Sequence, residues 1–153
     1  MAIKEQLEVL RQGVEEWNQW MEKNQGVRAD LSGADLSGAD LKGINLKNAV
    51  LFNANLIRAD FSNANLTNAD LSRTQVLETN FEGATLTGAC VFNWQINTET
   101  KLNNVKCDYL SGDTGFTTRR PVDRNFRPGE FAQIFKTVNE TLDRYLQEGI
   151  PPS

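Results

Sequence analysis

An apolar residue returns every five positions along the middle of this chain. Fourteen successive pentads carry Leu, Phe, Val or Ile at the same place, and alanine stands two positions earlier in ten of them. The apolar series is Leu31, Leu36, Leu41, Leu46, Leu51, Leu56, Phe61, Leu66, Leu71, Val76, Phe81, Leu86, Val91 and Ile96. Neither the 3.6-residue period of an α-helix nor the 2-residue period of a strand produces this spacing. The repeat therefore decides what this part of the chain folds into.

The individual pentads resemble those of a known family. Residues 29–33 and 34–38 both read ADLSG, and residues 64–68 read ANLTN. These words are similar to the A-(D/N)-L-x-x unit of the pentapeptide-repeat family. The resemblance implies an all-β solenoid: a right-handed quadrilateral parallel β-helix with one pentad on each side and about twenty residues per coil. Leu or Phe would fill the interior, with Ala where a bulkier side chain would not fit.

The repeat continues beyond its regular part with one change of phase. After Ile96 the phase slips by one residue, and Leu102 and Cys107 then resume the apolar series. Counting these two gives sixteen pentads, which is four coils. Because coils stack at the spacing of paired strands, ~4.8 Å, the solenoid should stand roughly 19 Å tall.

The segments on either side of the repeat are expected to cover its ends, because end coils expose their interior and their strand edges. Apolar residues at helical spacing predict an amphipathic helix over residues 2–24. Trp17 and Trp20 within it are interpreted as part of a lid in preference to a docking pair. A second amphipathic helix is predicted over residues 128–147. A lid is favoured there too, over a partner-binding helix or a dimer seam.

These patterns divide the chain into four parts. They are an N-terminal capping helix (1–26), the solenoid (27–109), an irregular Gly-, Thr- and Arg-rich segment (110–127), and a C-terminal amphipathic helix with its tail (128–153). Trp94 occupies an inward small-residue position and is interpreted as a plug where the solenoid ends. The Trp-Asn-Gln-Trp helix before the repeats, together with Arg119-Arg120-Pro121 and residues 125–131 after them, resembles cyanobacterial members of the family.

The composition argues against catalysis. The chain has no histidine, which removes the commonest general base and transition-metal ligand. It also lacks a calcium loop, a phosphate loop, a nucleophile elbow and a dinucleotide fingerprint. Cys107 is expected inside the solenoid, and Cys90 faces outward by register as an inert thiol. We therefore expect a non-enzymatic protein without cofactor or metal.

Charge and hydropathy argue against nucleic-acid binding and against a membrane span. The net charge of −4 argues against direct nucleic-acid binding. No apolar run approaches the ~20 residues of a membrane span, and the N-terminus carries no secretory apolar stretch. With two cysteines read as reduced thiols, these features indicate a cytoplasmic protein. A monomer, or a weak homodimer through a terminal helix, is expected.

Large apolar residues at outward-facing positions are the unusual feature of the solenoid surface. Twenty-residue stacking places Phe52 and Phe92 on one side and Ile57 and Leu77 on the next, so these four are a candidate protein-binding patch across a corner. The alternative is that the segment after the repeat folds back and buries them. Asp40 and Asp60 should stack as a solvated pair, and Arg58 with Glu78 as an exposed ion pair.

The segment after the repeat carries a second candidate contact. Arg119 and Arg120 form a basic pair that suits an acidic partner, and the alternative is a strap along the solenoid with solvated charges. Such long connections are uncommon unless they are functional or disordered.

Two classes of function follow. The preferred one is a rigid protein-interaction or scaffold module whose partner is unknown. The alternative comes from the family resemblance, which implies duplex-DNA mimicry that inhibits or protects gyrase-type topoisomerases. A DNA mimic roughly 19 Å tall would need about eleven negative charges. Residues 29–109 contain nine acidic and six basic residues, a net charge of −3. That charge density disfavours mimicry.

Overall fold

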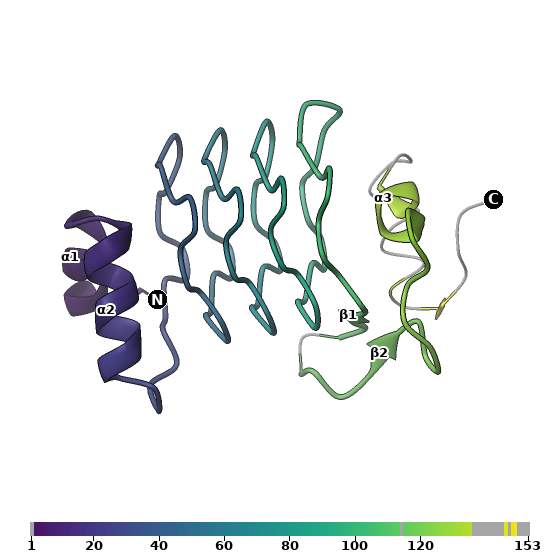
Figure 1. The fold of residues 1–153 in the computed structure, drawn as a ribbon, viewed down its shortest axis with the longest axis horizontal. Helices are drawn as coiled ribbons and strands as arrows, with labels where there is room; N and C mark the ends of the chain where they lie inside the picture. Colours follow the sequence, from purple (N-terminus) through teal and green to yellow (C-terminus); the bar gives the residue numbers. More distant parts are fainter. Residues whose placement is uncertain (1, 114, 136–145, 147, 150–153) are drawn as a thin grey trace.

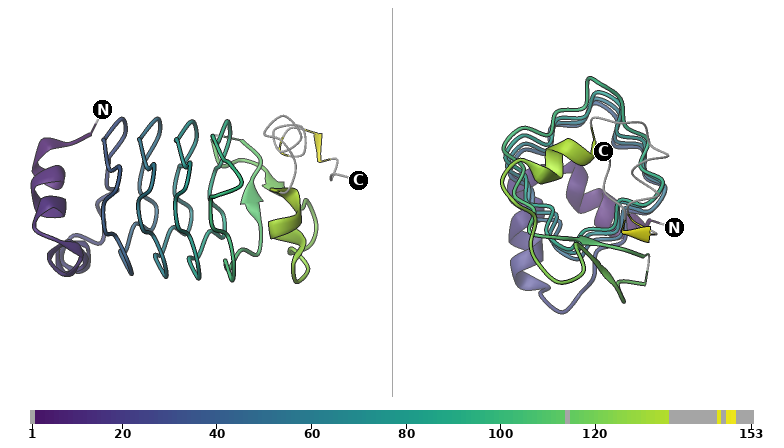
Figure 2. Two further views of the ribbon diagram at one scale, coloured as in Figure 1. Left: turned by 90° about the horizontal axis from the view of Figure 1, so that it is seen from above. Right: turned by 90° about the vertical axis from the view of Figure 1, so that its right-hand side faces the viewer.

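Parallel backbone bridges join each pentad to the pentad one coil away. The computed structural model describes residues 2–113, 115–135, 146, 148 and 149. Bridges pair residues twenty apart on each of four sides, as in Asp30 with Val50. They then pair Asn80 with Lys101 and Thr85 with Lys106, so the predicted one-residue slip is confirmed. The four coils form a square-sided stack, seen from the side in Figure 1 and from one end in Figure 2.

Each pentad folds through an interior residue and a tight corner. The apolar residues of the series from Leu31 to Val91 are at most 8% exposed, which confirms their assignment to the core. Two positions after each of them the chain turns with a positive φ, such as 57° at Asn68 and 77° at Gly88. Asn and Gly tolerate this left-handed conformation better than other residues. Each pentad of small, polar, apolar, polar and Asn or Gly residues therefore forms one side of a coil and the corner that follows it.

Two helices cover the first coil: α1 (Lys4–Arg11) and α2 (Val14–Lys23). The prediction of one continuous helix over residues 2–24 is wrong. Gly13 interrupts it with a φ of 121°, a conformation that residues with a side chain rarely adopt. The break lets both short helices lie across the end of the solenoid, as Figure 1 shows.

Polar side chains of these helices take the place of a preceding coil. Gln6 accepts a hydrogen bond from the backbone N–H of Asp30 through Oε1 (2.7 Å). Asn18 accepts one from the N–H of Asn45 (2.8 Å), and Trp17 Nε1 donates to the Asn45 carbonyl oxygen (2.8 Å). In later coils the equivalent groups bond to the backbone of a neighbouring coil. The lid therefore satisfies part of the strand edge that the first coil would otherwise expose.

The far end of the solenoid is covered by the segment that follows it. Strands β1 (Leu110–Ser111) and β2 (Arg119–Arg120) form an antiparallel hairpin, and α3 (Glu130–Ile134) packs nearby. Trp94 is fully buried, with its ring centroid 5.3 Å from that of Phe81 and 5.4 Å from that of Phe135. The indole therefore closes the core at this end, in the place predicted for it.

The predicted C-terminal helix is described only at its beginning. Helix α3 starts two residues after Pro128, which agrees with the predicted start. Residues 136–145 and 147, over which the prediction continues, lie outside the described residues.

The prediction that Cys90 faces outward to solvent is wrong, because its side chain is fully buried. The N–H of Ser111 donates to the Ala89 carbonyl oxygen (2.9 Å), so the chain after the repeat covers this side of the last coil. Burial raises the pKa of the Cys90 thiol to about 11. It also raises the pKa of Cys107, which is half-buried and whose Sγ donates to the Tyr109 carbonyl oxygen (3.3 Å). Both thiols are therefore protonated and unreactive near neutral pH.

Glu130 gives the C-terminal cap a dependence on pH. Its carboxylate accepts hydrogen bonds from the Arg124 guanidinium (2.7 and 2.8 Å) and from the Arg127 backbone N–H (2.9 Å). These bonds, those from Arg124 first, lower its pKa from 4.5 to about 2. Because the pKa of Glu130 is lower in the folded than in the unfolded chain, its ionised carboxylate stabilises the fold above pH 4.5. This contribution is lost as the pH falls toward 2.

We therefore expect Glu130→Gln to lower the melting temperature at pH 7, and the difference from the unchanged protein to shrink below pH 4.5. Thermal unfolding followed by circular dichroism between pH 7 and pH 3 measures this. Glu82→Gln, at an exposed solenoid position, is the matched control. A difference for Glu130→Gln that stayed constant across the range would contradict the assignment.

Candidate protein-interaction surface

Two of the predicted patch residues line a groove on one side of the solenoid. Phe52 is 37% exposed and Phe92 is half-buried. The groove has a volume of about 370 Å³, and its walls are formed by Phe52, Asp70, Ser72, Arg73, Phe92 and Asn93. All these residues belong to the second, third and fourth coils. The groove is thus built on a rigid scaffold.

The charges in this groove are not equivalent. The Oδ1 atom of Asp70 accepts hydrogen bonds from the backbone N–H (3.0 Å) and the hydroxyl of Ser72. The guanidinium carbon of Arg73 lies 5.7 Å from the centroid of the Phe52 ring. Within the described part of the chain, no ion pair is formed by Arg73. The groove therefore presents two aromatic rings together with one carboxylate and one cation that is not paired with it.

Ile57 and Leu77 lie on the next side of the solenoid and are half-buried. The Arg58 N–H donates to the Leu77 carbonyl oxygen (3.1 Å), as expected for neighbouring coils, and the predicted ion pair between Arg58 and Glu78 is formed. Neither Ile57 nor Leu77 lines the groove. The structure therefore brings Phe52 and Phe92 together and leaves the other two predicted residues outside.

The Arg119–Arg120 pair makes contacts within the chain. The Arg119 guanidinium stacks over Tyr109, 4.2 Å from the ring centroid, and donates to the carbonyl oxygens of Pro121 (2.9 Å) and Arg124 (2.7 Å). Arg120 donates to the Arg119 carbonyl oxygen (3.0 Å). Both side chains are half-buried. These contacts favour the strap interpretation of this segment over an acidic-partner contact.

The acidic side chains of the described residues do not gather into a metal site. No group of three or more Cys, Asp or Glu side chains there could hold a metal ion. Asp40 pairs with Asp60 in the neighbouring coil, as predicted, but the column continues with Asn80 and Lys101. Lys42 also lies 3.8 Å from Asp60. The acidic column is thus short and partly neutralised.

None of the helices in the described part of the chain combines the length and the hydrophobicity that crossing a membrane requires.

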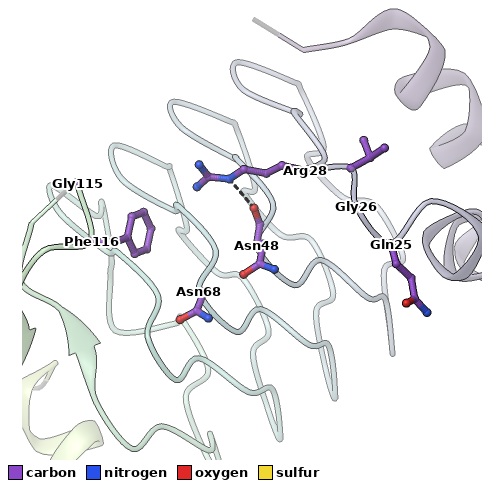
Figure 3. Close-up of a pocket in the computed structure, with 8 residues that line it drawn as sticks. Gln25, Gly26, Arg28, Asn48, Asn68, Gly115 and Phe116 are labelled. Carbon is purple, nitrogen blue, oxygen red and sulfur yellow. Dashed lines mark hydrogen bonds between the residues drawn. The ribbon is translucent and has the colours of Figure 1, made fainter.

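A second cleft, absent from the sequence predictions, lies along one corner of the solenoid (Figure 3). It has a volume of about 610 Å³ and is lined by residues 25–28 before the repeat, by Asn48 and Asn68 at the corner, and by Gly115 and Phe116 after the repeat. Sequence patterns could not reveal it, because its walls come from three segments that meet only in the folded chain.

Comparison with known families identifies the repeat. A family profile described as pentapeptide repeats matches residues 29–68 and 64–91, with eight copies in all. No protein with a curated description matches the sequence.

Several solved structures are similar to this chain. One is HetL from the cyanobacterium Nostoc sp. strain PCC 7120, described as involved in heterocyst differentiation regulation (26% identity, TM-score 0.42, covering 54% of this chain and 40% of HetL). Another is Rfr23 from the cyanobacterium Cyanothece 51142 (37% identity, TM-score 0.29, 53% and 58%). A third is a pentapeptide repeat protein of the Arabidopsis thaliana thylakoid lumen (27% identity, TM-score 0.30, 80% and 91%). The match thus spans about half the length of the first two proteins.

Proposed function

We propose that this chain, which belongs to the pentapeptide repeat family, is a non-enzymatic protein-interaction module. The fold of this family is a right-handed quadrilateral β-helix, and its members are generally non-catalytic. It presents the groove between Phe52 and Phe92 to a protein partner. The observation that carries this proposal is the pair of aromatic rings at outward positions, where the fold itself needs no large apolar side chain.

The chemistry of the groove limits the partner. Phe52 and Phe92 offer apolar contact, and Arg73 offers a cation beside them. Arg73 forms no ion pair among the described residues, so the proposal places the charged contact with the partner at this cation. A matching segment would insert one large apolar side chain between the rings and place an acidic residue beside Arg73. Aromatic and Arg side chains are also the residues that contribute most often to binding energy at protein interfaces.

The DNA-mimic alternative receives less support from the surface charges. The column Asp40, Asp60, Asn80 and Lys101 ends in a cation, and Lys42 lies beside it. Mimicry predicts binding to a topoisomerase that weakens steeply as salt is added, whereas an apolar groove predicts binding that survives salt.

Selection from a random peptide display library tests the proposal. We expect enrichment of peptides with a large apolar residue next to Asp or Glu, and binding that persists at 0.5 M salt. Phe52→Ser with Phe92→Ser should abolish this binding, because both walls of the groove are removed. Val122→Ser, at an exposed apolar position outside the solenoid, should leave it unchanged.

One further double variant and one purified protein distinguish the remaining alternatives. The double variant Ile57→Ser with Leu77→Ser changes the neighbouring side of the solenoid. If this variant lost peptide binding while Phe52→Ser with Phe92→Ser kept it, the interface would lie on that neighbouring side. Binding of purified gyrase at low salt only, unaffected by the groove variant, would contradict the proposal and support mimicry.

A further inference from the structure

The corner cleft shown in Figure 3 is separate from the proposed groove and shares no residue with it. Its volume of about 610 Å³ lies within the range of small-molecule sites. One wall is the link between α2 and the solenoid, the floor is the solenoid corner, and the other wall is the tip of the β1–β2 hairpin. Segments from before and after the repeat thus converge on one site.

A cation and an aromatic ring lie close together in the cleft. Arg28 donates through Nε to the Asn48 carbonyl oxygen (2.8 Å), which holds the side chain along the corner. Its guanidinium carbon lies 5.8 Å from the centroid of the Phe116 ring. Among the described residues the Nη groups make no hydrogen bond, so they are available to a ligand in the cleft that Arg28 lines. A guanidinium in this position can bind an anion through two parallel hydrogen bonds.

Phe116 is held where it is by the hairpin. Its φ is 59°, a conformation unusual for a bulky residue. The carboxylate of Asp113 fixes this turn by accepting hydrogen bonds from the backbone N–H (2.9 Å) and the hydroxyl of Thr117. Backbone strain that the surroundings impose is typical of ligand clamps. The ring is half-buried, so part of its surface remains for stacking.

The floor of the cleft offers two carboxamides. Asn48 and Asn68 line it, and within the described part of the chain neither side chain makes a hydrogen bond. Each carboxamide can donate and accept, as a polar ring edge requires. Both residues turn the corner with a positive φ, 63° at Asn48 and 57° at Asn68, which glycine also adopts at equivalent corners such as Gly88.

We infer that this cleft binds a small ligand that carries an anionic group and a planar ring. The anionic group binds the Nη groups of Arg28, the ring stacks on Phe116, and the edge of the ring hydrogen-bonds with the amides of Asn48 and Asn68. Stacking on an aromatic side chain and hydrogen bonding to Asn are the ways in which proteins bind heterocyclic rings. A nucleoside monophosphate and an aromatic carboxylate both have this chemistry.

Titrations followed by ¹H–¹⁵N NMR of the full chain test the inference with four probes. AMP and benzoate each carry a ring and an anion, adenosine lacks the anion, and inorganic phosphate lacks the ring. We expect AMP or benzoate to shift the signals of Arg28, Asn68 and Phe116, and to bind more tightly than adenosine or phosphate. Stronger binding of AMP identifies a nucleotide as the ligand class, and equal binding of benzoate identifies an aromatic carboxylate.

Three variants of the cleft and one control variant separate binding from folding. Arg28→Gln should weaken binding about ten-fold or more, because it removes the charge-assisted hydrogen bonds. Phe116→Gly should weaken it about ten-fold while relieving the positive φ, so its melting temperature should not fall. Asn68→Gly should weaken it about five-fold. Asn63→Gly makes the same change at a corner outside the cleft and should leave binding unchanged.

Three results would overturn the inference. They are the absence of shifts with both AMP and benzoate, binding of inorganic phosphate as tight as that of the better of these two, and equal effects of Asn63→Gly and Asn68→Gly.

Discussion

Replacing Phe81 with alanine should destabilise the solenoid by about 3–5 kcal/mol, which is a large part of the stability of a domain of this size. Phe81 is fully buried and lies in the middle of a column of rings. Its centroid is 5.7 Å from that of Phe61 and 5.3 Å from that of Trp94. Removing the ring leaves a cavity between two coils whose backbones are bridged to each other and cannot close on it. Equilibrium unfolding in urea measures the loss.

Two variants show whether position, and not residue type, causes this loss. Phe81→Leu should cost much less than Phe81→Ala, because leucine occupies the same place in most pentads. Phe52→Ala removes the same side chain from an outward position and should cost less than about 1 kcal/mol. Equal losses for Phe52→Ala and Phe81→Ala would show that the outward ring is part of the core.

The sequence predicts the solenoid well because each repeat unit corresponds to one structural unit of the coil. Each pentad supplies one interior residue and one corner, so the register of the coils follows from counting, including the slip after Ile96. Counting also finds Phe52 and Phe92 on one side. It cannot show that Arg73 lies over Phe52, since that depends on the rotamer of a long side chain.

The errors and omissions fall where the repeat ends. Gly13 divides a segment whose apolar spacing fits one helix, because a single φ outweighs the pattern. Cys90 has an outward position in its pentad, but the chain beyond the fourth coil covers it. The corner cleft needs Arg28 and Phe116 to meet along one corner of the solenoid, and no periodicity links two residues so far apart in the sequence. Contacts between non-repeating segments are set by tertiary packing alone.

Replacing Trp17 with alanine should have the second large effect on stability. Trp17 is fully buried and packs beside Trp20, with ring centroids 5.3 Å apart. Losing the indole should destabilise the protein by about 3–5 kcal/mol. Loss of the lid would also uncover the edge of the first coil, and an uncovered strand edge pairs with other chains. We therefore expect self-association that increases with concentration, measured by analytical ultracentrifugation.

Trp17→Phe separates the two contributions of this residue. It keeps an aromatic ring but removes the donor to the Asn45 carbonyl oxygen, which Trp17 Nε1 contacts at 2.8 Å. Leaving an acceptor at the coil edge without its partner costs about 1–3 kcal/mol of stability. The free energy of unfolding of Trp17→Phe should therefore lie between those of the unchanged protein and Trp17→Ala. Trp20→Phe, at the half-buried neighbour, is the matched control and should cost less. If Trp17→Ala stayed monomeric and as stable as Trp20→Phe, the helices would not act as a cap, and the edge of the first coil would have to be protected by its own residues.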